Sequence, residues 1–205
     1  MSAKSPTTIF NTPILSGIFH VLTKISMALA GWRIEGKLPD LPKYILIGAP
    51  HTSNWDFVLF LGIIFSLRAN VRFMGKAELF RWPVGGFFRY CGGIPVDRKR
   101  SQGLLDQIVK ASAESERFIL TIAPEGTRHE VADWKRGFYH IAKGAGIPIV
   151  MAKVDGIQKT AHVGEVFQPG TDIEADMKAI QASFTGMTGI NPRKKTKKKY
   201  LTLEG

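Results

Sequence analysis

The chain of 205 residues contains one cysteine, Cys91. A lone cysteine excludes an internal disulfide and fits a reducing compartment, and its simplest role is that of a small buried apolar residue. Long apolar runs are also missing. No run reaches the roughly 18 uninterrupted residues of a membrane-spanning helix, so the sequence predicts no such span.

The sequence lacks the residues that several kinds of catalytic and binding site require. There is no serine or cysteine in a nucleophile elbow, and there is no internal repeat. The histidines at 20, 129, 140 and 162 have no Cys or His partners at ligand spacing, so we expect neither a metal nor another cofactor. No nucleic-acid recognition motif with interleaved aromatic residues is present, and we expect no nucleic-acid partner.

Positive charge, by contrast, is abundant. The formal net charge is +11, and although six cations lie in the segment 193–199, the rest of the chain is still basic. This balance favours an anionic partner, either a membrane surface or nucleic acid. The tail would add about 1 kcal/mol per cation near an anionic leaflet. The alternative is that it serves only as a disordered, solubilising end.

The composition, 44% apolar, suits one domain with a full-sized core. We divide the chain into an N-terminal segment over 1–37, a main domain over 38–190 and a basic tail over 191–205. Helical spacing in the stretch 14–32 places six apolar side chains on one broad face: Ile14, Ile18, Val21, Leu22, Ile25 and Leu29. We expect a helix in the membrane interface, with packing on the domain's own core as the alternative.

Strand and helix patterns alternate along the main domain. The expected strands are 44–48, 71–75, 93–97, 117–123, 147–152 and 163–167; the expected helices are 57–67, 76–83, 87–91, 102–116, 135–145 and 172–184. Pro95 indicates that its strand lies at a sheet edge or strand end. The alternation predicts an α/β sandwich with a mixed, mostly parallel sheet flanked by helices.

A histidine and an aspartate follow the first of these strands. Ser53 fits a helix N-cap and Asp56 the third helical position, so His51 lies just outside the helix, at the carboxyl end of a strand. His51 can take a proton from a hydroxyl, and Asp56 can accept a hydrogen bond from the other ring nitrogen. The plainer interpretation is a helix-capping aspartate beside a surface histidine.

Two further polar motifs end strands: Asp97 with Arg98, and the segment from Glu125 to Arg128. Their cations, the Thr127 hydroxyl and the Gly126 amide are the groups that bind a phosphate. Each motif alone also fits a solvated arginine or an ordinary turn. Together with the His/Asp pair they describe a hydroxyl-activating base beside an anion clamp.

These residues resemble the glycerolipid acyltransferase family, which includes the lysophosphatidic acid acyltransferases. Four motifs of that family match in order over 51–150. They are His, four residues, then Asp (His51 and Asp56); a glycine-bounded segment ending in arginine (93–98); Pro-Glu-Gly-Thr-Arg (124–128); and an apolar strand with a central proline (147–150). The second motif departs from the family pattern, because Val96 stands where an aromatic residue is usual.

The resemblance implies a glycerol-3-phosphate acyltransferase-like sandwich and acyl transfer from acyl-coenzyme A or acyl-carrier protein to a lyso-phospholipid such as 1-acylglycerol-3-phosphate. His51 would be the base and Asp56 its partner. The acceptor phosphate would bind four residues: Arg98, Gly126, Thr127 and Arg128. Glu125 would orient a glycerol hydroxyl or an arginine. Backbone amides after His51, or Lys76, would stabilise the oxyanion, although Lys76 also fits a solvated lysine at a helix start.

We expect this enzyme to be peripheral, at the cytoplasmic face of the cell membrane. Another lyso-lipid, such as lyso-ornithine lipid, is an alternative acceptor. A thioester hydrolase would use the same His/Asp pair on water. Two alternatives are not enzymes. One is a basic nucleic-acid-binding module. The other, a non-catalytic lipid-binding protein, is the weaker alternative because all the motif residues are present.

Overall fold

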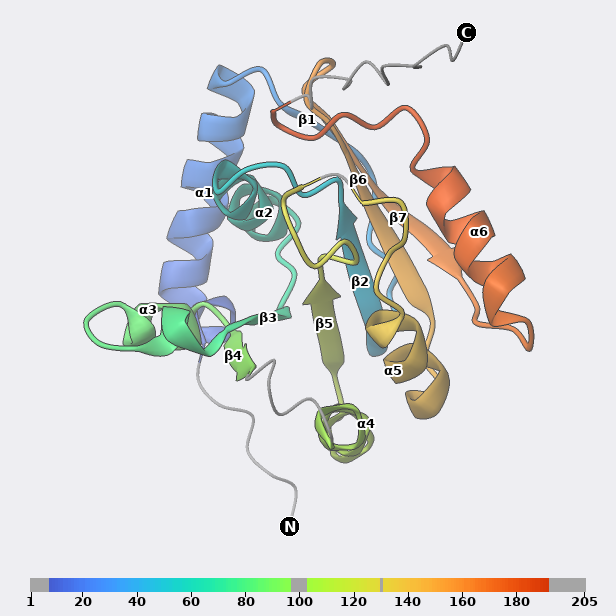
Figure 1. Cartoon of the computed structure of the whole chain (residues 1–205). Helices are drawn as coiled ribbons and strands as arrows, with labels where there is room; N and C mark the ends of the chain where they lie inside the picture. Colours follow the sequence, from blue (N-terminus) through green and yellow to red (C-terminus); the bar gives the residue numbers. More distant parts are fainter. Residues whose placement is uncertain (1–7, 97–102, 130, 192–205) are drawn as a thin grey trace, which may run out of the picture.

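One mixed sheet organises the computed structural model, which describes residues 8–96, 103–129 and 131–191 (Figure 1). Over these residues the strand order is β1-β7-β6-β2-β5-β3-β4. The strands are β1 (Arg33–Gly36), β2 (Lys43–Ala49), β3 (Arg72–Lys76), β4 (Gly93–Val96), β5 (Phe118–Ile122), β6 (Ile149–Asp155) and β7 (Thr160–Phe167). All neighbouring strands pair in parallel except β6 and β7, which are antiparallel.

Helices cover both faces of this sheet. They are α1 (Pro13–Leu29), α2 (Trp55–Ser66), α3 (Gly85–Tyr90), α4 (Leu104–Glu114), α5 (Gly137–Ala145) and α6 (Ile173–Ser183), with 3-10 helices η1 (Ile9–Asn11) and η2 (Ala77–Phe80). Figure 1 shows α1 and α2 on one side of the sheet and α5 and α6 on the other. The expected fold class, a mixed and mostly parallel sheet flanked by helices, is confirmed.

The central strand β2 explains why both faces need helices. Its side chains alternate between the faces, as the period of a strand requires. Ile45 and Ile47 pack in the core formed with α4, α5 and α6, whereas Tyr44 and Leu46 pack in the core beneath α2. A strand that is apolar on both sides is typical of the interior of an α/β sheet.

Most predicted elements are present, with ends shifted by a few residues. The proline-containing strand β4 lies at one edge of the sheet, as Pro95 indicated. The predicted helix over 76–83 is the shorter η2. Strand β1 was missed: residues 33–36, assigned above to the N-terminal segment, pair in parallel with β7. Only Ile34 in this strand is both apolar and partly buried. The sequence therefore lacks the run of apolar residues that predicts a strand.

Helix α1 packs on α2 along one side and exposes apolar residues on the other. The Phe19 ring stacks on Phe65 with centroids 5.0 Å apart, and His20 Nδ1 lies 2.9 Å from the Phe65 carbonyl oxygen. The six apolar side chains that were expected to share a face are all exposed. Packing on the domain is therefore observed for the side that faces α2, and a place in the membrane interface stays a prediction for the exposed side. None of the described helices has the length and apolarity to cross a bilayer.

Candidate active site

The site lies where β2 and β5 end. These strands pair in parallel, with Ile47 opposite Ile122, so the segments that follow them leave the same edge of the sheet. His51 belongs to the segment after β2, and its Nδ1 lies 2.8 Å from Asp56 Oδ2. With Nδ1–H donating to the carboxylate, Nε2 is the basic nitrogen of the ring.

A tight turn brings the His51 and Asp56 side chains together. Asp56 Oδ2 also accepts hydrogen bonds from the backbone N–H groups of Thr52 and Ser53, at 2.6 and 2.7 Å. The second oxygen, Asp56 Oδ1, is buried and has no hydrogen-bond partner among the described residues. The carboxylate therefore organises the whole turn, because its Oδ2 atom contacts one ring nitrogen and two backbone amides.

Two details of this turn differ from the sequence-based expectations. The N-cap of α2 is Asn54, so Asp56 is the second helical residue, and the prediction of Ser53 as N-cap was wrong. Ser53 Oγ instead accepts from the Trp55 amide at 3.1 Å. The amides of Thr52 and Ser53, which were among the expected oxyanion donors, are engaged by Asp56.

Glu125 joins the second motif to the first. It is 5% exposed, and its Oε2 accepts a hydrogen bond from the His51 backbone N–H at 2.8 Å. This contact was not anticipated, because Glu125 was expected to orient a glycerol hydroxyl or an arginine. The buried carboxylate fixes the backbone at His51, so in this structure it positions the candidate base.

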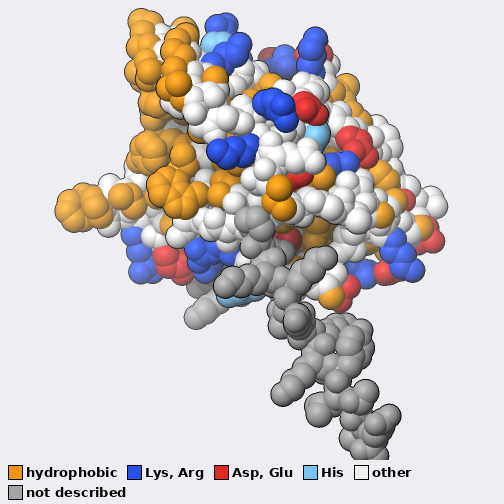
Figure 2. Space-filling model, turned by 90° about the horizontal axis from the view of Figure 1, so that it is seen from above, with side chains coloured by type: hydrophobic (Ala, Val, Ile, Leu, Met, Phe, Trp, Pro, Cys, Tyr) orange, Lys and Arg blue, Asp and Glu red, His pale blue; other side chains and the backbone are white. Residues whose placement is uncertain are grey.

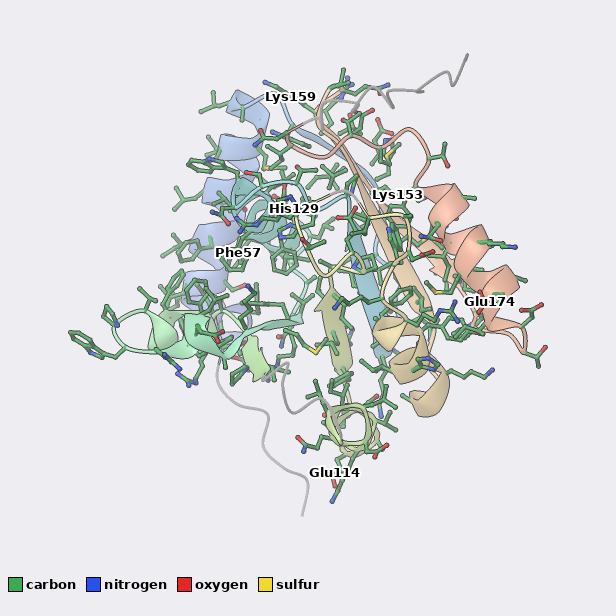
Figure 3. All side chains as sticks on the ribbon, viewed as in Figure 1. Phe57, Glu114, His129, Lys153, Lys159 and Glu174 are labelled. Carbon is green, nitrogen blue, oxygen red and sulfur yellow. The ribbon has the colours of Figure 1, made fainter. Side chains whose placement is uncertain are left out.

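The rest of the motif forms the turn after β5. Gly126 has φ +64°, and a Cβ there would lie 2.9 Å from the aliphatic chain of Lys135. The Arg128 guanidinium donates from Nη1 to Asn54 Oδ1 at 2.5 Å, and Thr127 Oγ1 accepts from the His129 amide at 3.3 Å. Phe57 on α2 and His129 in the loop after β5, both labelled in Figure 3, lie on the two segments that form the site.

The remaining predicted residues are less closely tied to this centre. Lys76 is exposed at the end of β3, directly after Gly75, which lines the cavity described next. Asp97, Arg98 and the predicted basic tail from residue 192 onward lie outside the described residues. The structure therefore brings together His51, Asp56, Glu125, Gly126 and Arg128. Their catalytic and binding roles stay predictions.

A cavity of about 570 Å³ opens beside the histidine and runs between α2 and the sheet. His51, Asn54 and Asp56 supply polar groups to its lining. Most of the remaining wall is apolar: Leu46, Phe57, Leu59, Phe60, Ile63, Phe73, Met74, Leu79, Phe88, Val154 and Val163 are among its residues. Gly48 also lines it, and a Cβ at that position would meet no atom within 4 Å. The volume and lining are those of a site for a mainly apolar ligand.

Sequence reasoning missed three features of this site. Asn54 was not singled out, although a polar residue before an apolar helix is an ordinary capping signal. Lys135, whose side chain lies against Gly126, belongs to none of the motifs found in the sequence. The segment near the C-terminus also braces the turn, because the Asn191 amide donates to Thr52 Oγ1 at 3.1 Å. A contact between residues 139 positions apart has no local signature.

Comparisons with known proteins identify the fold and the family of the chain. No curated protein matches the chain in sequence. Among solved structures, the chain is similar to the crystal structure of the 1-acyl-sn-glycerophosphate (LPA) acyltransferase PlsC from Thermotoga maritima, with 20% identity and a TM-score of 0.60. The likeness covers 83% of this chain and 77% of that chain, and at this identity it establishes the fold.

The family itself follows from the sequence. A family model described as Acyltransferase matches residues 33–153, which is more than half of the chain. This range contains the His/Asp pair, Glu125 and the turn after β5. The expected family and enzyme class are thereby confirmed: the chain belongs to the acyltransferase family and is an O-acyltransferase.

Proposed function

We propose that this enzyme moves a fatty acyl group from acyl-coenzyme A or acyl-carrier protein to the hydroxyl of a lyso-phospholipid, with 1-acylglycerol-3-phosphate as the leading candidate. The observation that carries the proposal is a His/Asp pair with 2.8 Å between Nδ1 and Oδ2 on the wall of a mainly apolar cavity of about 570 Å³. The pair supplies a base, and the cavity accommodates an acyl chain beside it. The thioester is a co-substrate, and the chemistry proposed here uses no other cofactor.

The chemistry needs one proton carrier. His51 Nε2 takes the proton of the acceptor hydroxyl while the oxygen attacks the thioester carbonyl carbon. Asp56 stabilises the imidazolium that forms. When the tetrahedral intermediate collapses, the C–S bond breaks and the thiolate leaves with the proton that His51 returns. The carbonyl oxygen carries the developing charge, and with two nearby amides engaged by Asp56, Lys76 is the remaining candidate donor named from the sequence.

The turn after β5 is the candidate phosphate site. Arg128 is tied to Asn54 at the start of α2, so its charge is held beside the histidine segment. Gly126 at positive φ presents no side chain there, its amide donates to the Ala123 carbonyl at 3.1 Å, and Lys135 lies against it. Arg98, outside the described residues, would add a further cation. Guanidinium groups and backbone amides are the usual ligands of phosphate oxygens.

A lipid substrate places the enzyme at a membrane surface, at the cytoplasmic face in this proposal. Eight large apolar residues of α1 are exposed, among them the six expected to share a face, and Leu29 is 85% exposed. Figure 2 shows hydrophobic side chains gathered on one side of the molecule, with cations close by. An apolar helix face combined with basic charge is the usual pairing of signals for reversible binding to an anionic leaflet.

The proposal is tested by thiol release from the purified full chain. Each donor, acyl-coenzyme A and acyl-carrier protein, is incubated with and without a panel of lyso-lipids, among them 1-acylglycerol-3-phosphate and lyso-ornithine lipid. We expect release that depends on a phosphate-bearing acceptor, with the diacyl product identified by mass spectrometry. Release that no acceptor changes would identify a thioester hydrolase instead. Silence from folded protein with both donors would contradict the proposed reaction.

A further inference from the structure

The segment 77–90 forms a hairpin made of η2, the connecting residues 81–84 and α3, and we call it the 77–90 hairpin. In Figure 1, α3 projects away from the sheet beside the first turns of α1. Its outer side chains are apolar and exposed: Trp82 is 93% exposed and Phe87 is 55% exposed, and Leu79 and Val84 add to the surface. Clustered apolar side chains of this size mark an interaction surface.

The hairpin has a fixed shape. A Cβ at Gly85 would lie 2.0 Å from the Phe80 carbonyl oxygen, so the two halves approach as closely as a glycine allows. The Gly85 amide donates to the Arg81 carbonyl at 2.8 Å. Arg89 donates to the Phe80 carbonyl at 3.0 Å, and its guanidinium carbon lies 5.5 Å from the Phe80 ring centre. The exposure of Trp82 is therefore built into the fold.

The base of the hairpin is attached to the start of α1. The Tyr90 hydroxyl donates to Thr12 Oγ1 at 3.1 Å, directly before the first residue of α1. The exposed apolar side of α1 begins two residues later, at Ile14. Figure 2 shows the corresponding hydrophobic atoms on the same side of the molecule. The hairpin and α1 thus present their apolar surfaces together.

The inner side of the hairpin belongs to the cavity of the active site. Phe88 lines that cavity, and the partly exposed Leu79 borders both the cavity and the outer surface. The rings of Phe87 and Phe88 lie 5.7 Å apart, and Phe88 lies 5.7 Å from Phe57, the residue after Asp56. An unbroken series of aromatic contacts therefore connects the outer surface of the hairpin to the wall beside the catalytic pair.

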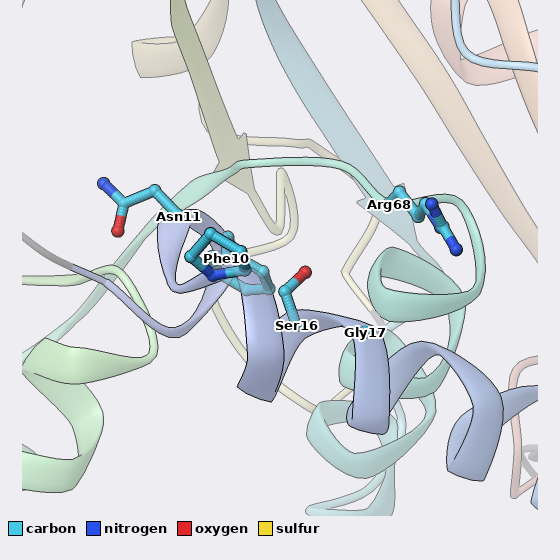
Figure 4. Close-up of a pocket in the computed structure, with 6 residues that line it drawn as sticks. Phe10, Asn11, Ser16, Gly17 and Arg68 are labelled. Atoms are coloured by element: carbon cyan, nitrogen blue, oxygen red, sulfur yellow. The ribbon is translucent and has the colours of Figure 1, made fainter.

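Cations accompany both apolar surfaces. Arg81 and Arg89 are exposed on the hairpin and outnumber its one exposed acidic residue, Glu78, and Lys24 is exposed on α1. Arg68 lines a pocket of about 300 Å³ beside the first turns of α1, together with Asn11 and Ser16 (Figure 4). A second copy of the chain on this surface would bring like charges together, which is unfavourable. An anionic lipid leaflet offers both an apolar interior and negative headgroups.

We propose that the 77–90 hairpin is a second membrane anchor, which inserts Trp82 and Val84 into an anionic leaflet beside α1. Trp is enriched at the boundary between headgroups and acyl chains. A lipid then passes from the leaflet along Phe87, Phe88 and Phe57 to the cavity. The route to the cavity rests on the proposed function, whereas the anchoring does not, so the two can fail separately.

The anchoring is tested by sedimentation of the full chain with phosphatidylcholine vesicles that contain phosphatidylglycerol. The variant Trp82→Ser/Val84→Ser should partition onto these vesicles roughly tenfold less than the wild type. Leu105→Ser is the control, because Leu105 is an exposed apolar residue on α4, on the opposite face of the sheet. Vesicles with brominated chains should quench the wild-type tryptophan emission more than that of Trp82→Phe. Equal partition or equal quenching would overturn the proposal.

The lipid route is tested by the form in which the acceptor is presented. The double variant should transfer acyl groups to a short-chain, monomeric lyso-lipid as fast as the wild type. With the acceptor embedded in vesicles, its rate should fall roughly tenfold. An equal loss in both assays would overturn the route. If the wild type transfers to neither, the proposed function fails, while sedimentation and quenching still decide the anchoring. A dimer that the double variant abolishes would overturn the anchor in favour of a second copy.

Discussion

Asp56 satisfies three donors with one oxygen. Its Oδ2 accepts from His51 Nδ1 and from two backbone amides, so one carboxylate both shapes the turn and orients the ring. An asparagine in the same place keeps the shape and an oxygen for the amides. It cannot stabilise an imidazolium, because it carries no charge.

Asp56→Asn should therefore separate structure from catalysis. We expect kcat to fall on the order of 10³-fold, because the charged histidine loses its partner. The thermal unfolding midpoint should change by only a few degrees, since the amide oxygen can still accept from Thr52 and Ser53. Steady-state kinetics and a melting curve on the same preparation make the measurement. A variant with wild-type kcat would remove Asp56 from the mechanism.

Cys91 gives a prediction about pH. Burial raises the pKa of its thiol from 9.0 to about 11. The folded state thus favours the neutral thiol, and this contribution to stability is fully present below about pH 9 and lost as the pH rises towards 11. The free energy of unfolding, measured by urea at about pH 8 and about pH 10.5, should fall more for the wild type than for Cys91→Ala. Parallel pH dependences in the two proteins would contradict this.

At the scale of elements, the turn after β5 depends on a glycine. Gly126 has φ +64°, and a methyl group would press on the Lys135 chain at 2.9 Å. Gly146 ends α5 with φ +63°, yet a Cβ there meets no atom within 4 Å. The two glycines share the same left-handed backbone conformation and differ in whether they adjoin the candidate phosphate site.

Gly126→Ala and Gly146→Ala should each lose about 1 kcal/mol of unfolding free energy, because alanine is strained at positive φ. Only Gly126→Ala should also raise KM for the lyso-lipid, by roughly tenfold or more, since its turn must shift. Chemical denaturation and acceptor titrations give both quantities. A KM that rises equally in both variants would show that the effect comes from instability alone.

Local pattern predicted most elements but not all of them. The run 44–48 was recognisable as a strand because apolar residues fill it and turn residues bound it. Residues 33–36 offered no such signal, since β1 exists through pairing with β7, whose residues lie more than 120 positions away. The helix start at Asn54 was misplaced by one residue, because Ser53, Asn54 and Asp56 all suit a cap.

At the scale of the whole molecule, the candidate active site is where several distant elements meet. The motifs at 51–56 and 124–128 could be placed together from the sequence because parallel strands share a carboxyl edge. The cavity could not be predicted, since its wall combines α2, α3, η2 and five strands. Its shape depends on packing between elements, which no local pattern encodes.

The cavity predicts a graded effect at Gly48, whose Cβ position is open space. The series Gly48→Ala, Gly48→Val and Gly48→Leu should fold normally while it progressively narrows the cavity. We expect the preferred donor to shift towards shorter acyl chains, with the largest loss for the longest chain in Gly48→Leu. Competition between acyl donors of different length measures this. An unchanged chain-length profile would place the acyl chain elsewhere.

The most direct test of the account compares two histidine variants in one assay. His51→Ala removes the candidate base, whereas His140→Ala removes an exposed histidine on α5, across the sheet from the cavity. Acceptor-dependent release of coenzyme A or acyl-carrier thiol is measured for both, with the fold checked by circular dichroism. We predict a loss on the order of 10³-fold or more for folded His51→Ala and wild-type activity for His140→Ala. Acceptor-dependent release that survives in His51→Ala would contradict the mechanism.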